Sequence, residues 1–260
     1  MSPIWIPAGT LCWREIIRFV RQRSRVTGAF AQPLVFWVLL GGGLKASFRP
    51  PGVSEGTSYV EYFYPGALAL MLLFTAIFST ISVVEDRHEG FLQGVLVAPV
   101  KRSTIVLGQA LGGTILALMQ GMLFLLFAPV VGIPLSMLGM LVGIGVMFLI
   151  AFSLTCLGLV IAWRMDSTQG FHAIMNLILL PIWLLSGAFF PASGVSSWLG
   201  WVMQVNPLTY GMAALRHCLY WGYPVSVGEV PALAPSLLIT ALFTIVTFVF
   251  AIQAARQSHL

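Results

Sequence analysis

Residues 103–163 read STIVLGQALGGTILALMQGMLFLLFAPVVGIPLSMLGMLVGIGVMFLIAFSLTCLGLVIAW and include no Asp, Glu, Lys or Arg. A helix crosses the hydrocarbon core of a bilayer with roughly 20 apolar residues, so this stretch is long enough to cross it twice. The segment PVVGIP at 129–134 divides the stretch, because proline and glycine end helices. These residues therefore predict two membrane spans, at 103–128 and at 135–163.

The composition of the whole chain predicts more spans of the same kind. Of 260 residues, 58% are hydrophobic and 8% are charged, and the mean hydropathy is +0.95. A soluble globular domain has about 25% charged residues, so a water-soluble enzyme, a disordered chain and a disulfide scaffold all fit poorly. Further charge-free stretches predict spans at 26–44, 62–84, 171–188 and 233–255. The expected fold class is an all-α polytopic membrane protein, with six transmembrane helices in a single domain over 1–260.

The basic residues lie beside the predicted spans. The formal net charge is +5, and most of the thirteen Lys and Arg residues fall on one side of the membrane when the N-terminus is placed inside. Because this distribution is the one that orients membrane proteins, both termini are expected to be cytoplasmic, and no nucleic-acid partner is expected. The cysteines are far apart and form no C-x-x-C pair, so no metal site is expected at Cys12, Cys156 or Cys218.

An amphipathic helix is predicted within residues 1–25, immediately before the first span. Its basic side chains share one arc, and apolar side chains that include Trp13 lie opposite. Such a helix usually lies flat at the membrane surface, with its cations toward anionic lipid headgroups, and an ordinary solvated helix end is the alternative interpretation. The residues expected to face the headgroups are Arg14, Arg18, Arg21 and Arg25.

The segment 189–232 has two interpretations. It could hold a seventh span near 195–215, and the count of basic residues on each side does not distinguish this from six spans. The pair Asn206-Pro207 interrupts the helical pattern, however, and a broken backbone at membrane depth must be buried in protein or face water. We therefore favour an external or re-entrant hairpin of two short helices, with Asn206, Pro207 and Tyr210 at its corner.

Catalytic and nucleotide-binding patterns are missing from the sequence. A P-loop needs a lysine directly after a glycine, and the only lysines, Lys45 and Lys101, follow other residues. Ion-coupled pumps usually place an ionisable group inside the membrane, but the predicted spans have none near their centres. The chain is therefore expected to be neither an enzyme nor an ATPase, and active transport would have to be driven by a partner.

The charged loop at 85–102 is the place where such a partner could attach. It contains a short predicted helix with apolar pairs spaced i, i+4, preceded by acidic residues and followed by cations, as the helix dipole prefers. A short cytoplasmic helix with exposed apolar side chains suits a groove on a soluble protein. The same segment could also be a surface helix that only returns the chain to the membrane.

Two motifs resemble a known family. Arg87-His88-Glu89-Gly90 with Leu92, followed by Leu96-Val97-Ala98-Pro99-Val100, is similar to the cytoplasmic loop of type-2 ABC transporter permeases. The second motif resembles the segment after span 5 in the same family, and it combines Leu185-Ser186-Gly187-Ala188-Phe189-Phe190-Pro191 with Asn206-Pro207-Leu208-Thr209-Tyr210. The order of the interfacial helix, spans, loop and hairpin extends the resemblance over nearly the whole chain.

The resemblance implies a permease homodimer that docks two separate ATPase subunits. ATP and Mg would be bound by those subunits, with no cofactor on this chain. The implied function is export of a drug, a lipid or a lipid-linked glycan across a prokaryotic plasma membrane. The residues implied in docking are Arg87, His88, Glu89, Phe91, Leu92, Val95, Leu96 and Pro99.

A path for an apolar or amphiphilic cargo is expected between spans 2 and 5. Its candidate lining is Phe74, Phe78, Met175, Leu179 and Trp183, and ordinary helix packing is the alternative interpretation of each. Two other functions stay open. One is a secondary transporter or channel, and the other is a lipid-modifying enzyme with a polar site at Glu61, Tyr62 and Tyr64.

Overall fold

A computed structural model describes residues 5–43, 58–97, 99–192, 195–223 and 230–257. Helices make up nearly all of these ranges, and no strand occurs within them. The elements, in chain order, are α1 Trp5–Arg21, α2 Arg23–Gly43, α3 Tyr59–His88, α4 Phe91–Val97, α5 Arg102–Leu125, η1 Ala128–Val131, α6 Met137–Ala162, α7 Thr168–Trp183, η2 Leu184–Ala188, α8 Ser197–Val205, α9 Pro207–Leu219 and α10 Leu233–Gln257.

The prediction of six spans in an all-α membrane protein is confirmed. Six helices are long and apolar enough to cross a membrane: α2, α3, α5, α6, α7 with η2, and α10. The boundaries agree within a few residues except in α3, which extends past the expected 62–84 to Tyr59 and His88. In 189–232, the described helices α8 and α9 have 9 and 13 residues, so each is shorter than a span.

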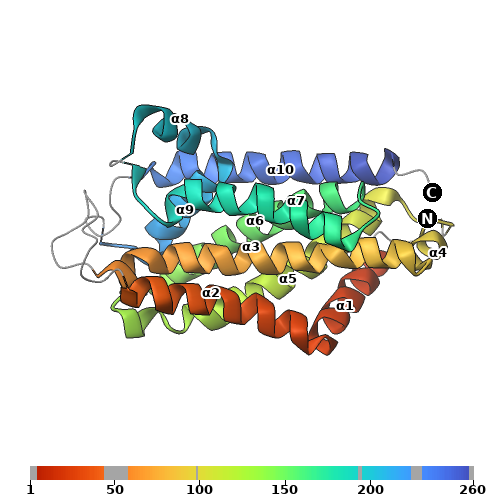
Figure 1. The fold of residues 1–260 in the computed structure, drawn as a ribbon, viewed down its shortest axis with the longest axis horizontal. Coiled ribbons are helices and arrows are strands. Elements are labelled where there is room, and N and C mark those ends of the chain that lie inside the picture. Colours follow the sequence, from red (N-terminus) through yellow and green to blue (C-terminus); the bar gives the residue numbers. More distant parts are fainter. Residues whose placement is uncertain (1–4, 44–57, 98, 193–194, 224–229, 258–260) are drawn as a thin grey trace.

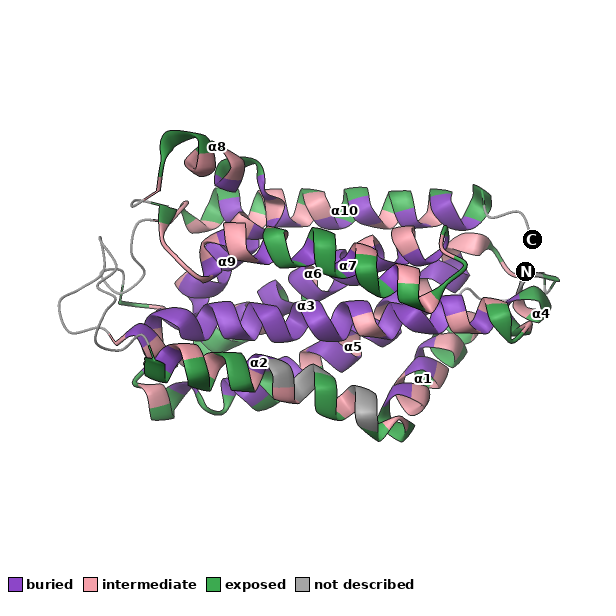
Figure 2. Ribbon diagram, in the orientation of Figure 1, coloured by how far each residue is buried: buried purple, intermediate pink, exposed green. Residues whose placement is uncertain are grey.

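Helix α3 forms the centre of the bundle. Figure 1 shows the long helices lying side by side around it, and Figure 2 shows that it is buried along almost its whole length. In its most apolar window 94% of the residues are buried, compared with 28% for α10 and 13% for α2. A helix that is hydrophobic all round belongs in the interior of such a bundle, whereas the exposed apolar faces of α2 and α10 suit contact with lipid.

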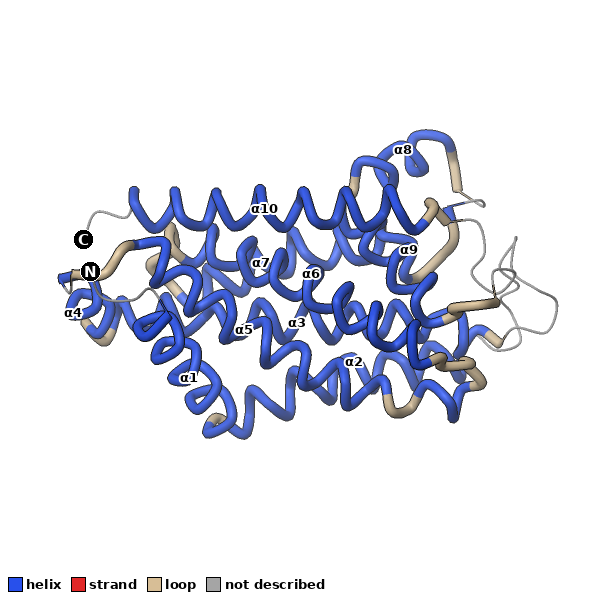
Figure 3. Tube along the Cα trace, turned by 180° about the vertical axis from the view of Figure 1, so that it is seen from behind, coloured by secondary structure: helices blue, strands red, loops and turns tan. Residues whose placement is uncertain are grey.

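The bundle has two distinct ends. The start of α1, the end of α10 and the short helix α4 lie at one end, which we call the α4 end, and α8 lies at the other (Figure 1). Seen from behind, α1 rests obliquely on α5 near the α4 end (Figure 3).

Glycine pairs allow two of the closest helix contacts. A Cβ on Gly108 would lie 2.8 Å from the carbonyl oxygen of Ala8, and one on Gly112 would lie 2.8 Å from the Cβ of Glu15, so this pair forms the seam between α5 and α1. The pair Gly139 and Gly143 has the same spacing on α6 and faces α9 around Cys218. Both G-x-x-x-G patterns therefore mark close backbone approach, as expected for small residues between membrane helices.

Candidate functional site

Helix α1 is oriented differently from the sequence-based prediction. Its buried side faces α5 and consists of Ala8, Cys12, Glu15 and Phe19. Part of the apolar arc is exposed instead, at Trp5, Ile6, Trp13 and Val20. The expectation that Arg14 and Arg18 face lipid headgroups is wrong, because both guanidinium groups bind carboxylates of α3. Arg21 is exposed, and the side chain of Arg25 lies outside the described residues.

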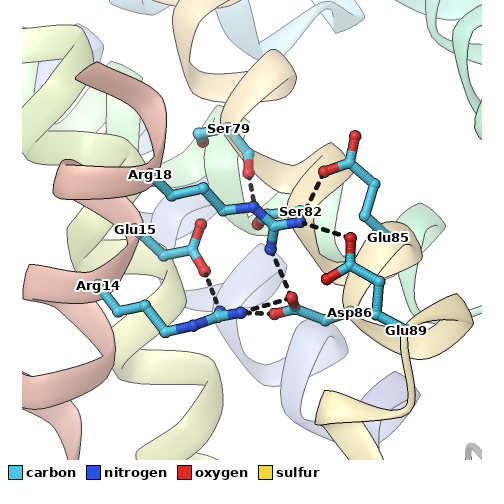
Figure 4. Close-up of polar contacts among 8 residues, drawn as sticks. All are labelled: Arg14, Glu15, Arg18, Ser79, Ser82, Glu85, Asp86 and Glu89. Atoms are coloured by element: carbon cyan, nitrogen blue, oxygen red, sulfur yellow. Dashed lines mark hydrogen bonds and ion pairs between the residues drawn. The ribbon is translucent and has the colours of Figure 1, made fainter. Parts of the chain in front are cut away.

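Asp86 is the centre of these contacts (Figure 4). Its carboxylate is 1% exposed and accepts two hydrogen bonds of 2.7 Å from the Nη1 and Nη2 atoms of Arg14. Arg18 also donates to the same carboxylate through Nη1. A bidentate arginine pair fixes the relative orientation of its partners as well as their distance, so Asp86 sets the position of α1 against α3.

Three more carboxylates complete what we call the α1–α3 charge cluster: Glu15, Glu85 and Glu89 (Figure 4). Arg18 Nη2 donates to Glu85 at 2.8 Å and lies 3.8 Å from Glu89. Burial raises the pKa of Glu15, and the negative charge of Asp86 acts in the same direction, against the opposing effects of Ser82 and the two arginines. The cluster therefore contains one carboxyl group whose pKa is raised by its burial.

The sequence explains why the cluster forms here. Arg14 and Arg18 are spaced i, i+4 and so share one face of α1, while Glu85, Asp86 and Glu89 occupy the last turns of α3 and the residue after it. Acidic groups at a helix C-terminus are opposed by the helix dipole. The two guanidinium groups compensate for this, which is consistent with the extension of α3 past the predicted end at 84. Carboxylates in the last turn of a span, on the same side of the membrane as an arginine face, could have indicated the pairing.

The same end of α3 is tied to the link between α6 and α7. Arg87 donates to the carbonyl oxygens of Trp163 at 2.6 Å and Met165 at 3.2 Å, and to the carboxylate of Asp166 at 2.9 Å. His88 shares a hydrogen bond with the backbone carbonyl of Asp166. Residues 85–89 thus contact α1 on one side and the α6–α7 link on the other.

Helix α4 continues directly from this joint. Gly90 adopts φ +76°, a left-handed conformation suited to glycine, and turns the chain from α3 into α4. Phe91 is 39% exposed, and the Arg14 guanidinium lies 3.7 Å from the centre of its ring. Val97 is 87% exposed. The α4 end therefore presents apolar side chains beside the charge cluster.

The expected docking residues differ in how far their side chains are exposed. Leu92 is only 1% exposed and packs into the bundle core, so the expectation that it is an exposed anchor is wrong. His88, Glu89 and Pro99 are exposed, whereas Val95 is half-buried. The side chain of Leu96 lies outside the described residues.

The candidate cargo-path residues lie on α3 and α7, two helices that contact each other. Phe74 stacks on Phe78 with ring centres 5.5 Å apart, and Met175, Leu179 and Trp183 are buried in the same core. Trp183 donates from Nε1 to the carbonyl oxygen of Gly66 at 2.9 Å. In the single chain these side chains pack α7 against α3.

The hairpin corner is tied to the end of α7. The Asn206 side chain caps α9 by accepting from the Leu208 N–H at 3.0 Å, and it donates to the Ile182 carbonyl at 2.6 Å. Pro207 is the first residue of α9, where its missing N–H has no cost. Tyr210 donates to the Gln204 carbonyl at 2.9 Å, which holds α8 to α9.

The two tyrosines considered for a lipid-modifying enzyme donate to different carbonyls. The Tyr64 hydroxyl donates to the carbonyl of Phe124, whereas the Tyr62 hydroxyl donates to the carbonyl of Gly187. Among the described residues, no group of three or more His, Cys, Asp and Glu could hold a metal ion. The cluster of ionisable groups that stands out is the one at the α4 end.

The fold and this site define a class of protein. It is a polytopic helical membrane protein whose central helix, α3, ends in a cluster of ion pairs beside the short surface helix α4. Residues 8–220 match the model of the ABC-2 type transporter family, and the chain belongs to this family. It is a membrane permease of the ABC transporter type, and membership implies association with ATPase subunits.

Named relatives agree with this assignment. A protein of Cyanophora paradoxa named as transport permease ycf38 is 29% identical over 90% of this chain and 84% of its own length. Nodulation protein J of Rhizobium leguminosarum bv. trifolii is 26% identical over 85% of each chain. ABC transporter G family member 20 of Dictyostelium discoideum is 27% identical over 68% of this chain, which corresponds to 24% of that longer protein.

Proposed function

We propose that this chain is the permease subunit of an ATP-driven exporter, and that separate ATPase subunits dock on α4. The observation that carries this proposal is the continuity of α4 with the end of α3, which is bonded both to α1 and to the α6–α7 link. A push on α4 would therefore move three parts of the bundle together.

The apolar surface of α4 supports docking at this end. Phe91 and Val97 are exposed large apolar side chains on a helix of seven residues, next to the charged residues Glu89 and Arg87. Interfaces commonly combine apolar anchors with a charged rim. Leu92, in contrast, would fix α4 to the bundle, so that a force on α4 reaches α3.

The remaining features of the proposal concern the assembly and the cargo. Two copies of the permease would pair with two ATPase subunits, which bind ATP and Mg, in a prokaryotic plasma membrane with both termini cytoplasmic. The α3–α7 contact around Phe74 and Leu179 is apolar, so its opening would suit a drug, a lipid or a lipid-linked glycan. ATP-driven closure of the ATPases would open this contact toward the outside.

The docking proposal is tested by co-purification of the permease with a co-expressed candidate ABC ATPase subunit. We expect Val97→Asp to reduce ATPase capture about tenfold or more, because removal of a central anchor costs roughly 1–2 kcal/mol and the carboxylate adds a desolvation cost. Val130→Asp is the matched control, since Val130 is 83% exposed on η1, which follows the end of α5 remote from α4. Failure of the wild-type permease to retain the ATPase, or equal capture by the Val97→Asp variant, would contradict the proposal.

Transport assays separate docking from force transmission. Leu92→Ala leaves the exposed surface of α4 in place but removes its buried anchor, so we expect the ATPase to bind while transport falls. Loss of ATPase capture in Leu92→Ala, with transport lost in parallel, would show that the residue acts in docking itself.

A further inference from the structure

The fifth span is irregular at the end opposite α4. After Trp183 the helix widens into a π-helical segment at Leu184–Ala188, which we call the α7 break, and Gly187 adopts φ +78°. Pro181 precedes the break and contributes no N–H. A break of this kind releases backbone carbonyls from the helical ladder, and at membrane depth they need donors from elsewhere in the protein.

Side chains of α3 and of the α8–α9 hairpin supply these donors. Tyr59 of α3 donates to the Phe189 carbonyl at 3.3 Å, and Tyr62 of α3 donates to that of Gly187 at 3.4 Å. Thr209 of α9 lies 3.4 Å from the Leu185 carbonyl. The break is thus held from both sides, by the central helix and by the hairpin.

Arg216 makes the only charged contact to the α7 break among the hydrogen bonds of the described residues. It lies on α9, is 5% exposed and donates from Nη2 to the Gly187 carbonyl at 3.0 Å and to the Tyr62 carbonyl at 3.5 Å. Its guanidinium carbon lies 4.2 Å from the centre of the Tyr62 ring. Within the described part of the chain, no carboxylate forms an ion pair with it.

Burial of the Arg216 charge costs desolvation free energy, which a residue that only fills space would not need to overcome. Within the described residues, this buried cation is compensated by carbonyl dipoles and an aromatic face, and the carbonyls at a helix C-terminus favour a cation. Arginine, unlike lysine, can donate in its plane and stack on a ring at once. The contacts of Arg216 therefore depend on the Gly187 carbonyl and the Tyr62 ring keeping their relative positions.

We propose that Arg216 is a positioning residue that holds the α7 break, and that α7 bends at Leu184–Ala188 when its contact with Gly187 is released. Because Tyr62 lies on α3, a displacement of α3 would loosen this contact. The proposed hinge requires only contacts within the permease and does not depend on an ATPase subunit. Only its consequence for export, an opening at this end of α7, rests on the proposed function.

The test is hydrogen–deuterium exchange of the permease alone in nanodiscs, read on peptides that cover residues 183–190. We expect Arg216→Gln to raise exchange there at least tenfold and Arg216→Lys to raise it less, while peptides of α6 stay unchanged. Thr244→Val is the matched control, because it removes a hydroxyl bond of 3.2 Å from α10 to the Leu149 carbonyl of α6. It should leave 183–190 unchanged.

The outcomes separate a hinge from a general structural role. Wild-type exchange at 183–190 in Arg216→Gln would overturn the proposal, and so would an equal rise throughout α3, α6 and α10. If Arg216→Gln does not fold, Arg216→Lys decides, since wild-type exchange in that variant would contradict the need for the planar guanidinium. A local rise in a permease that fails to bind the ATPase would support the hinge and refute the proposed function.

Discussion

Replacing Asp86 by Asn should detach α1 from α3 while keeping the shape of the side chain. The carboxylate of Asp86 accepts N–H groups from Arg14 at both oxygens and a further one from Arg18. The amide of Asn can accept at one oxygen only, and its NH2 group would face a guanidinium donor. The change therefore breaks the bidentate pair and leaves two cations short of a counter-charge.

The magnitude follows from the burial of the two sides. Removal of one partner from a buried ion pair costs about 3–5 kcal/mol. Asp86 is 1% exposed, but Arg14 and Arg18 are 29% and 17% exposed and can be partly hydrated after the loss. We therefore take the lower limit of about 3 kcal/mol, which corresponds to a roughly 100-fold increase in the undocked population of α1.

Cys12 reports on this equilibrium. It is 8% exposed on the face of α1 that packs on α5, and burial raises the pKa of its thiol, so the docked form reacts slowly with maleimide for two reasons. Cys156 and Cys218 are buried elsewhere in the bundle, at 0% and 1% exposure, and serve as internal references. The labelling rate of Cys12 in Asp86→Asn should rise roughly 100-fold, in proportion to the undocked population.

Asp166→Asn provides the control for charge removal. Its carboxylate pairs with Arg87 but is 87% exposed, and exposed pairs contribute less than about 1 kcal/mol, so Cys12 labelling should change by less than about fivefold. A Cys12 rate in Asp86→Asn within threefold of the wild-type rate would refute the reasoning. So would a similar increase at Cys156, because the change would then be global unfolding.

Three further predictions test other contacts within the bundle. Gly108→Ala should raise Cys12 labelling about tenfold by forcing α1 off α5, whereas Gly145→Ala, with nothing within 4 Å of the added Cβ, should not. Because the folded-state pKa of Glu15 is raised above its ordinary 4.5, this residue contributes fully to the free energy of unfolding below pH 4.5. The contribution is lost as the pH rises through the higher folded-state pKa. The Tm of the wild type should therefore fall over that range relative to Glu15→Gln. Trp183→Phe keeps an aromatic side chain but removes the indole N–H that donates to the Gly66 carbonyl, so the unfolding midpoint in denaturant should drop by the equivalent of about 1–3 kcal/mol.

The spans were predictable because their cause is local. A run of apolar residues without charge must be buried or face lipid wherever it lies in the fold, so the boundaries follow from 103–163 and the similar stretches. The glycine pairs were predictable in part, since Gly108 and Gly112 indicate close approach but not the partner. That the partner is α1 depends on tertiary packing.

The orientation of α1 could not be read from its periodicity. Trp13 and Phe19 fall on one apolar arc in the sequence, yet Trp13 is 64% exposed and Phe19 is buried on α5. The arc is wider than the surface of α5, and Arg14 and Arg18 are attracted to Asp86 at the same time. Helical periodicity alone treats this arc as a single face, so it predicts a helix that turns all its cations to the membrane surface.

Arg216 was visible in the sequence but its role was not. A single cation between Leu215 and His217 in an apolar hairpin qualifies as a functional candidate, because ionisable groups near membrane depth are rarely retained without a use. Its partner, however, is a backbone carbonyl at Gly187, and carbonyls carry no identity in a sequence. Only the fold brings α9 to the break in α7.

The two ends of α3 connect these observations. At one end Asp86 fixes α1 and Arg87 fixes the α6–α7 link, and at the other end Tyr62 shares Arg216 with the α7 break. Helix α3 has 30 residues and is buried along most of its length, so its close-packed side chains connect its two ends, and Pro65 interrupts its internal backbone bonds near Tyr62. Under the proposed function, a displacement that enters at α4 would pass along α3 toward Tyr62. Helix α7 is contacted at both of its ends by α3 or its neighbours, but only the far end contains a break. Motion of α3 would then be taken up where α7 is weakest, at Leu184–Ala188.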